Sequence, residues 1–238
     1  MKAMIFAAGL GTRFKPWTDH HPKALALVNG KSLLQRNIEY LQQYNIREVV
    51  VNVHHFANQI IDAVEKNNGW GSKITISDER EEVLETGGGL LKARALLESD
   101  EQFITLNADI LTDLPIDKLA AFHHSCNALI SFGVTNRKSS RCFLFDDDNR
   151  LCGWENNQTG EKKISIDKKG LHQMAYSCVA IFNREVFDLI PQRGKFSLTD
   201  TYLSLAANHL ILGYNYSGGK FIDVGKPESV ALAEQLFD

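Results

Sequence analysis

Short apolar runs bounded by turn-forming residues recur through the first part of the chain. Runs this short predict buried β-strands, because helices of globular proteins usually extend over about ten residues or more. The predicted strands are residues 3–7, 48–53, 74–77, 103–107 and 128–134.

Segments with helical spacing separate these predicted strands. Leu34, Ile38 and Leu41 share one helical face after Ser32, a suitable N-cap residue, and residues 60–64 form a second apolar face. Alternation of strands and helices favours a mostly parallel sheet with helices on both faces. We therefore expect an α/β fold of the Rossmann-like, doubly wound kind, which binds ligands beyond the carboxyl ends of its strands.

The pattern changes after residue 134. Residues 142–145 and 151–154 predict a β-hairpin, which we interpret as a small β insertion. Because no Pro- or Ser-rich linker separates the two parts, we expect a single domain over residues 1–238, with halves of about 1–134 and about 135–238. The later predicted elements are helices at 184–190, 201–210 and 227–237 and a strand at 221–224.

Composition and charge exclude several classes of protein. The chain of 238 residues is 44% hydrophobic and 23% charged, which is typical of a globular domain and argues against wholesale disorder. The formal net charge is −3 and no run of Lys or Arg exceeds two residues, so neither nucleic acid nor an acidic membrane is an expected partner. No segment approaches the roughly 20 apolar residues of a membrane helix.

The cysteines indicate the compartment. Cys126, Cys142, Cys152 and Cys178 form no C-x-x-C pair and have no close histidine at zinc-binding spacing, so we interpret them as free thiols. Free thiols, together with an N-terminus that does not read as a signal peptide, predict a reducing, cytoplasmic location.

The first predicted strand leads into residues 8–13, A-G-L-G-T-R, and Lys23 follows. Two glycines let backbone N–H groups approach an anion closely, and the nearby cations add charge, so this loop is a candidate phosphate site. A plain strand-to-helix turn is the alternative. A Rossmann dinucleotide site is not supported, because Phe14 stands where its third glycine would be, and a Walker loop is excluded by Leu25.

Two aspartates lie at the ends of predicted strands that are far apart in the chain. Asp109 follows the strand at 103–107, and Asp223 lies in the short strand at 221–224. Mg²⁺ is typically held by one or two carboxylates together with substrate phosphates, so the pair is a candidate metal site if the fold brings it together. Turn-forming or helix-capping aspartates are the alternative.

A third candidate is the run L-E-T-G-G-G at residues 84–89, before a predicted helix at 91–97. Three glycines at the start of a helix would let a flat ligand lie against bare backbone. A flexible linker is the alternative, but the adjoining Glu85, Thr86 and helix argue against it.

These segments occur together, in one order, along nearly the whole chain. They are A-A-G-x-G-T-R-F at 7–14, P-K at 22–23, L-E-T-G-G-G at 84–89, N-x-D at 107–109 and D-V-G at 223–225. In this combination the chain resembles the sugar-1-phosphate nucleotidyltransferases. The L-E-T-G-G-G run and the lack of a C-terminal β-helix are most similar to the muramate-type uridylyltransferases of that family.

The resemblance implies that the first glycine loop binds a nucleoside triphosphate. The residues implied in this binding are Ala8, Gly9, Gly11, Thr12 and Arg13. Gly88 would approach the base or ribose of the same nucleotide.

The resemblance also implies which residues act at the reacting centre. Asp109 and Asp223 would hold Mg²⁺, the expected cofactor, and Lys23 would contact the reacting phosphates. Arg13, Lys23 and Asp109 are the expected catalytic residues. The family usually has a proline after this lysine, where this chain has Ala24.

The implied reaction joins a nucleoside triphosphate to a sugar 1-phosphate and releases pyrophosphate. Uridine triphosphate and an amino-sugar 1-phosphate are the expected substrates, and guanylyl, thymidylyl or cytidylyl transfer to another phosphorylated small molecule is the alternative. A non-catalytic nucleotide-sugar binding or regulatory module is a second alternative. The presence of Arg13, Lys23, Asp109 and Asp223 argues against it. Residues 135–238 would contribute the sugar-binding insertion, in which Lys162 or Lys163 is a candidate for a second sugar-phosphate lysine.

Overall fold

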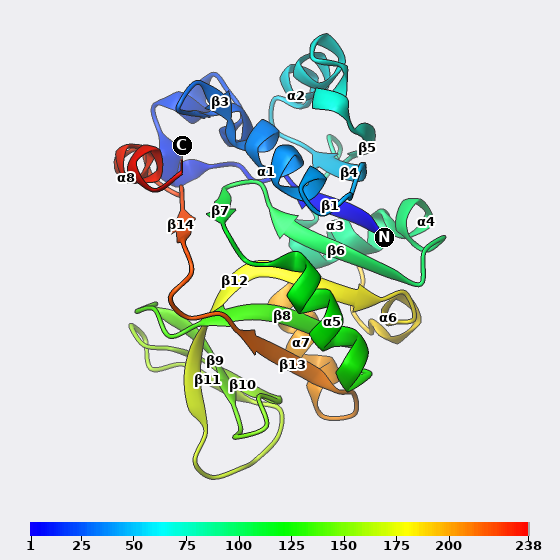
Figure 1. Cartoon of the computed structure of the whole chain (residues 1–238), viewed down its shortest axis with the longest axis vertical. Helices are drawn as coiled ribbons and strands as arrows, with labels where there is room; N and C mark the ends of the chain where they lie inside the picture. Colours follow the sequence, from blue (N-terminus) through cyan, green and yellow to red (C-terminus); the bar gives the residue numbers. More distant parts are fainter. Residues whose placement is uncertain (238) are drawn as a thin grey trace.

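The computed structural model describes residues 1–237. Four parallel strands form the first part of its central sheet (Figure 1). In this part β1 (Lys2–Phe6) lies between β4 (Glu48–Val53) and β6 (Gln102–Asn107), and β5 (Lys73–Asp78) pairs with β4. All four strands were predicted, and each begins and ends within one residue of the predicted bounds.

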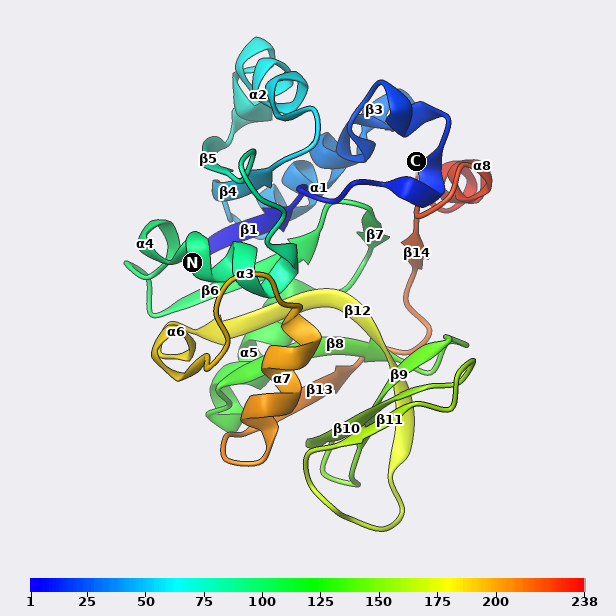
Figure 2. The ribbon, with the colours of Figure 1, turned by 180° about the vertical axis from the view of Figure 1, so that it is seen from behind.

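Helices cover both faces of this parallel part (Figures 1 and 2). Along β1, Ala3 and Ile5 belong to the buried cluster on the face covered by one set of helices. Met4 and Phe6 belong to the cluster on the opposite face, which a second set covers. This alternation is the two-residue period of a strand that is buried on both faces, and it confirms the doubly wound fold. The first set is α1 (Leu33–Gln42), α2 (Ala57–Lys66) and α5 (Ile116–Cys126), and the second is α3 (Glu85–Lys92), α4 (Arg94–Leu97) and α7 (Leu198–Ala206).

A largely antiparallel part of the sheet is joined to the first part through β12 (His172–Asn183). This strand pairs with β6, with β8 (Ile130–Thr135) and with β9 (Arg141–Phe145). The predicted hairpin is confirmed as β9 and β10 (Leu151–Asn156). The sequence did not predict β12, nor the outer strand β11 (Lys162–Ile164), nor β13 (Ile211–Asn215), which pairs with β8.

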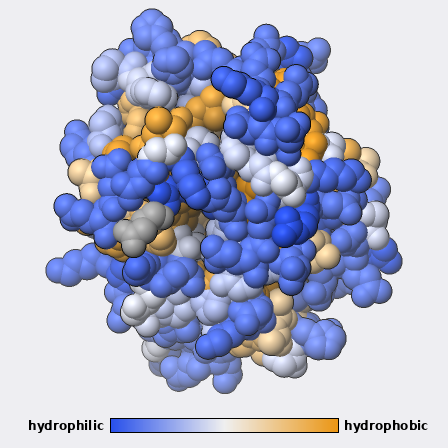
Figure 3. Space-filling view, turned by 45° about the horizontal axis from the view of Figure 1, so that its top comes forward, coloured by the Kyte–Doolittle hydropathy of each residue, from blue (hydrophilic) through white to orange (hydrophobic). Residues whose placement is uncertain are grey.

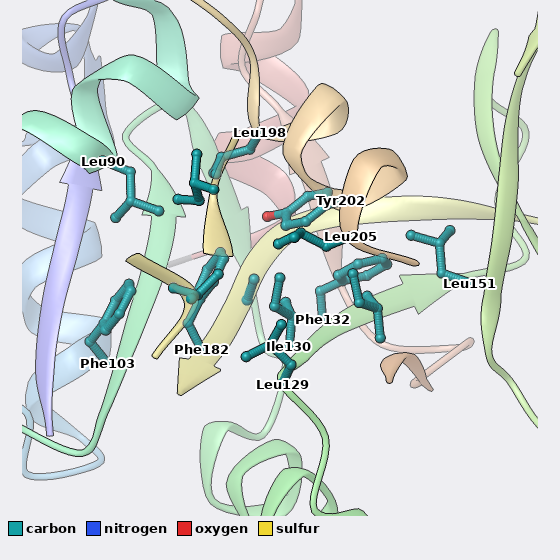
Figure 4. Close-up of a cluster of buried hydrophobic side chains, with 14 of the residues drawn as sticks. Leu90, Phe103, Leu129, Ile130, Phe132, Leu151, Phe182, Leu198, Tyr202 and Leu205 are labelled. Atoms are coloured by element: carbon teal, nitrogen blue, oxygen red, sulfur yellow. The ribbon is translucent and has the colours of Figure 1, made fainter. Parts of the chain in front are cut away.

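An aromatic cluster fills the core between this part of the sheet and α7 (Figure 4). Phe132 on β8 is fully buried, and its ring centroid lies 5.0 Å from that of Tyr176 and 5.1 Å from that of Tyr202. Phe103 and Phe182, on neighbouring strands, stack with centroids 5.1 Å apart. These rings link the two parts of the sheet into one core.

Three predicted helices differ from the observed ones. The helix expected at 91–97 begins instead at Glu85, so the glycines of the L-E-T-G-G-G run lie inside α3. The helix expected at 201–210 begins at Leu198, because Ser197 and Asp200 form a capping box, and it ends at Ala206. The helix expected at 184–190 is a single turn, α6 (Val186–Leu189).

Short elements complete the fold. The two-stranded pairs are β2 (Leu27–Val28) with β3 (Lys31–Ser32), and β7 (Ile110–Thr112) with β14 (Phe221–Asp223). The closing helix is α8 (Glu228–Leu236), and the 3₁₀ turns are η1 (Thr12–Phe14), η2 (Trp17–Asp19), η3 (Lys23–Leu25) and η4 (Asn68–Gly71).

The surface seen in Figure 3 is predominantly hydrophilic. Among residues 1–237 no helix has the length and apolar character needed to cross a bilayer.

Candidate active site

A cavity of about 520 Å³ opens at the carboxyl ends of β1, β4 and β6. This is the position at which doubly wound sheets bind their ligands. Most of the residues singled out from the sequence line it. They are Ala8, Gly9, Gly11, Thr12, Arg13, Lys23 and Asp109.

The glycine loop has a conformation that requires glycine at one position. Gly11 has a φ of 61°, and a Cβ atom there would lie 2.8 Å from Cγ2 of Thr18. The Thr18 hydroxyl donates a hydrogen bond of 2.9 Å to the Gly11 carbonyl. Phe14, which replaces the third Rossmann glycine, is buried in a small core with residues of α8 and β14, so it anchors the loop.

Lys23 and Asp109 form an ion pair inside the cavity. The Lys23 ammonium lies 2.5 Å from Oδ2 of Asp109, and the two side chains are 11% and 27% exposed. The Asn37 amide donates a 3.0 Å hydrogen bond to the Ala108 carbonyl, which fixes the turn that carries Asp109. The pair therefore has a defined position at the end of β6.

Asp223 is brought beside Asp109 by the pairing of β14 with β7. The Val224 amide donates a 2.9 Å hydrogen bond to the Asp109 carbonyl, and Arg13 Nη2 lies 4.0 Å from Asp223 Oδ2. Partial burial and the neighbouring Asp109 raise the pKa of Asp223, and the positive charges of Lys23, Arg13 and Arg137 partly offset this. The fold thus brings the two aspartates together, which is the condition for a shared metal site.

Two carboxylates beside an open cavity fit a Mg²⁺ ion that also binds substrate phosphates. Among the described residues, no group of three or more His, Cys, Asp and Glu side chains could hold a metal ion. The arrangement therefore suits an ion that completes its coordination with substrate and water, and it does not suit a site built from protein ligands alone.

The sequence matches the nucleotidyl transferase family over residues 2–237. The chain belongs to this family. It is 30% identical to the N-acetylmuramate alpha-1-phosphate uridylyltransferase of Neisseria meningitidis serogroup B, over 94% of this chain and 93% of that protein. It is also 39% identical to the mannose-1-phosphate guanylyltransferase catalytic subunit beta of Dictyostelium discoideum, over 100% of this chain and 64% of that protein.

The fold agrees with that of a solved structure, HddC from Yersinia pseudotuberculosis complexed with GMP-PN. The TM-score is 0.79 at 24% identity, over 100% of this chain and 99% of that chain. The resemblance to sugar-1-phosphate nucleotidyltransferases and the expected fold class are thus confirmed.

One glycine of the L-E-T-G-G-G run in this nucleotidyl transferase has a packing role. Gly88 does not line the cavity, and a Cβ atom on it would lie 2.2 Å from the Gly194 carbonyl oxygen. Gly87 is in similarly close contact with Phe196. These glycines allow α3 to pack closely against the 194–196 segment, which gives Gly88 a packing role, and its expected contact with the base or ribose stays a prediction.

Several residues that line the cavity were not predicted from the sequence as site residues. Asn52 interrupts the apolar run of β4 one residue before its end, and a polar side chain in such a run was the available indication. Glu85 and Thr86 line the cavity from the start of α3, and Lys195 lies 3.8 Å from Glu85 across it. Lys195 belongs to a loop without a motif, so the sequence offered no indication of it.

Neither candidate for a second sugar-phosphate lysine lines the cavity. Lys162 Nζ lies 3.7 Å from a Glu155 carboxylate oxygen, and Lys163 lies 3.7 Å from Glu161 and 3.8 Å from Asp200. Both are half-exposed on β11, where these acidic side chains balance their charge.

Proposed function

We propose that this nucleotidyl transferase joins uridine triphosphate to an N-acetylated amino-sugar 1-phosphate, with Mg²⁺, and releases pyrophosphate. The observation that carries the proposal is that Arg13, Lys23 and Asp109 line one cavity beside the glycine loop, with Asp223 next to Arg13 and Asp109. The part of about residues 135–238 would supply the sugar-binding side of the same domain.

The chemistry needs no covalent enzyme intermediate, because the phosphate of the sugar is already ionised at neutral pH. An oxygen of that phosphate attacks the α-phosphorus in line, the bond to the bridging oxygen breaks, and pyrophosphate leaves. The task of the protein is to bring two polyanions together. Two unit charges 4 Å apart repel by about 1 kcal/mol in water and by about 4 kcal/mol at an effective dielectric constant of about 20.

Arg13 and Lys23 offset this repulsion. Both line the cavity, and each lies beside a carboxylate when no substrate is bound. Triphosphate oxygens would compete for the same cations, so Lys23 would exchange Asp109 for a phosphate while Asp109 and Asp223 hold Mg²⁺. When bound, this ion adds positive charge at the reacting phosphates. Backbone N–H groups around Gly9 and Gly11 would bind the remaining oxygens.

The choice of uridine is supported by the similarity to the uridylyltransferase of Neisseria meningitidis, which covers nearly the full length of both chains. Guanylyl transfer is the competing proposal, because the relative from Dictyostelium discoideum is the more identical of the two, although the match covers less of that protein. Thymidylyl and cytidylyl transfer remain alternatives. For the compartment we propose the cytoplasm, on the ground that all four cysteines are free thiols.

A substrate matrix tests the proposal. Four nucleoside triphosphates, those of uridine, guanosine, thymidine and cytidine, are each combined with hexose and amino-sugar 1-phosphates, and pyrophosphate release is followed with and without Mg²⁺. We expect the highest kcat/KM with uridine triphosphate and an N-acetylated amino sugar. A higher kcat/KM with guanosine triphosphate would replace the uridylyl assignment, and no pyrophosphate release in any well would favour a non-catalytic binding module.

A further inference from the structure

A buried chain of hydrogen bonds lies behind the glycine loop. The Ala7 amide donates to Asn52 Oδ1 at 2.7 Å, and Asn52 Nδ2 donates to Glu79 Oε1 at 2.8 Å. Asn52 and Glu79 are 2% and 0% exposed. The three residues lie at the ends of β1, β4 and β5, so the chain runs across the carboxyl edge of the sheet.

Glu79 and the Ala7 N–H group together fix which way the Asn52 amide points. An asparagine side chain has one accepting and one donating end, whereas an ionised carboxylate only accepts. With Glu79 as its neighbour, Asn52 must present its nitrogen to the carboxylate and its oxygen to Ala7. The Ala7 amide is thereby held at the point where β1 ends and the glycine loop begins.

Gly89 makes room for the same contact. A Cβ atom on Gly89 would lie 2.7 Å from Glu79 Oε1 and 2.9 Å from Asn52 Nδ2. Gly89 lies inside α3, where alanine would be the better helix former. The third glycine of the L-E-T-G-G-G run is therefore explained by the chain of hydrogen bonds.

Burying a carboxylate is unfavourable unless its partners compensate. Burial raises the pKa of Glu79, and the Asn52 amide, the Leu84 backbone, Lys92 and His54 partly offset the effect. A buried leucine at this position would avoid this unfavourable burial, so the carboxylate needs an explanation in what it orients.

We propose that Glu79 is a positioning residue for the nucleotide, which acts through Asn52 on Ala7 and so orients the loop that begins at Ala8. This inference rests on the proposed function, in which that loop binds the triphosphate. Glu79 itself does not line the cavity.

Removal of the accepting group tests the inference. Glu79→Met keeps a side chain of similar length and leaves Asn52 without its acceptor. We expect KM for the nucleoside triphosphate to rise about tenfold, with a smaller change in kcat, because one hydrogen bond to a buried partner is lost. Glu79→Gln retains an accepting oxygen, so its KM should rise by less than about threefold.

An exchange of the donating and accepting groups between positions 52 and 79 gives a sharper test. In Asn52→Asp alone, two carboxylates would face each other over the 2.8 Å contact, and KM should rise more than in Glu79→Met. In the double variant Asn52→Asp with Glu79→Gln, the glutamine amide can donate to the new carboxylate, which still accepts from Ala7. The formal charge of the pair then equals that of the natural protein, and we expect KM to return to within about threefold of it.

Gly89→Ala would place a methyl group of α3 against the contact between Asn52 and Glu79. It should raise KM for the nucleoside triphosphate, although alanine favours the helix. Glu81→Gln, an exposed change on the same loop, is the matched control and should leave KM unchanged. Hydrogen exchange of the Ala7 amide, measured by NMR without substrate, should be faster in Glu79→Met than in the control.

The outcomes separate the two proposals. If the natural protein releases no pyrophosphate, the proposed function fails, and Ala7 exchange still tests the hydrogen-bond chain. If it is active but the double variant is no better than Asn52→Asp, the positioning role is refuted. Should Glu79→Met fail to fold, the double variant and Gly89→Ala give the decision, and an unchanged KM in Gly89→Ala counts against the inference.

Discussion

The two parts of the sheet hold their side chains in place by different physical means. At the cavity beside the carboxyl edge of the parallel part, charged side chains are partly exposed and paired, as in Lys23 with Asp109 and Arg13 with Asp223. In the antiparallel part, they are buried rings that pack around Phe132. Partly exposed ion pairs contribute about 1 kcal/mol or less to stability, whereas a buried ring contributes several times as much.

The difference indicates a division of labour within one sheet. Charged side chains at the edge can exchange partners at small cost, because each of their ion pairs is expected to contribute little to stability. The aromatic core cannot rearrange cheaply, so it provides the fixed support for that edge. Each prediction below tests whether activity and stability are separable in this way.

The largest expected effect is on stability. Phe132→Ala should lower the free energy of unfolding by about 3–5 kcal/mol, because it removes a fully buried ring from the centre of the aromatic cluster. Urea denaturation measures this change. Ile164→Ala, on the outer strand β11 where the side chain is 47% exposed, is the control and should change stability by less than about 0.5 kcal/mol. If Phe132→Ala lowered the free energy of unfolding by less than about 1 kcal/mol, the buried rings would stabilise the protein no more than the ion pairs do.

The next effect is on catalysis. Asp109→Asn and Asp223→Asn should each slow turnover by about 10²- to 10³-fold, because each removes a carboxylate from the proposed Mg²⁺ site. Pyrophosphate release at several Mg²⁺ concentrations measures the loss, and the melting temperature should change little. Asp147→Asn, an exposed change in the insertion, is the matched control. Near-normal turnover by either folded variant would contradict the metal assignment.

A smaller loss is expected when a cation is removed. Lys23→Ala and Arg13→Ala should each lower kcat by about 10²-fold, as for the loss of one donor to a developing charge. Arg13→Lys should restore only part of the activity, since an ammonium cannot reproduce the guanidinium fork. Lys15→Ala serves as the control, because Lys15 is exposed on the same loop and pairs with Asp19. A change in melting temperature without a change in kcat would make Arg13 and Lys23 structural.

The same contrast explains what the sequence could predict. In the parallel part, continuous apolar runs are buried on both faces and mark the strands directly, and the residues that follow each strand reach one edge. Asp109 and the glycine loop could therefore be placed together from sequence. Asp223 was placed beside them on family resemblance, and the pairing of β14 with β7 accounts for its position.

In the antiparallel part, the sequence pattern marks the strands less clearly. Strand β12 mixes polar and apolar residues, and its pairing with β8 is irregular between Tyr176 and Ala180, so the two-residue period is interrupted. The packing role of Gly88 left no indication in the sequence for a related reason, because it is a contact with a distant segment near Gly194. Such contacts depend on the tertiary fold and leave no local pattern.

The smallest expected effect concerns this irregularity. Cys178 lies within the irregular stretch of β12 and has a φ of 60°, in the left-handed region that glycine adopts without strain. The left-handed conformation costs a residue with a Cβ atom about 1–2 kcal/mol, but glycine also loses more chain entropy on folding, by about 0.5–1 kcal/mol. Cys178→Gly and Cys178→Ala both remove the partly buried thiol, so the difference between them isolates the backbone strain. We expect the glycine variant to be the more stable by about 0.5–1 kcal/mol in urea denaturation, the net of these opposing effects. Burial raises the pKa of the Cys178 thiol, and Asp109 and Asp223 lie close enough for their charges to raise it further. Because both variants remove this thiol, kcat should be similar in the two. If the alanine variant were the more stable, the irregularity of β12 would not be a strained feature, and its interrupted pattern would need another explanation.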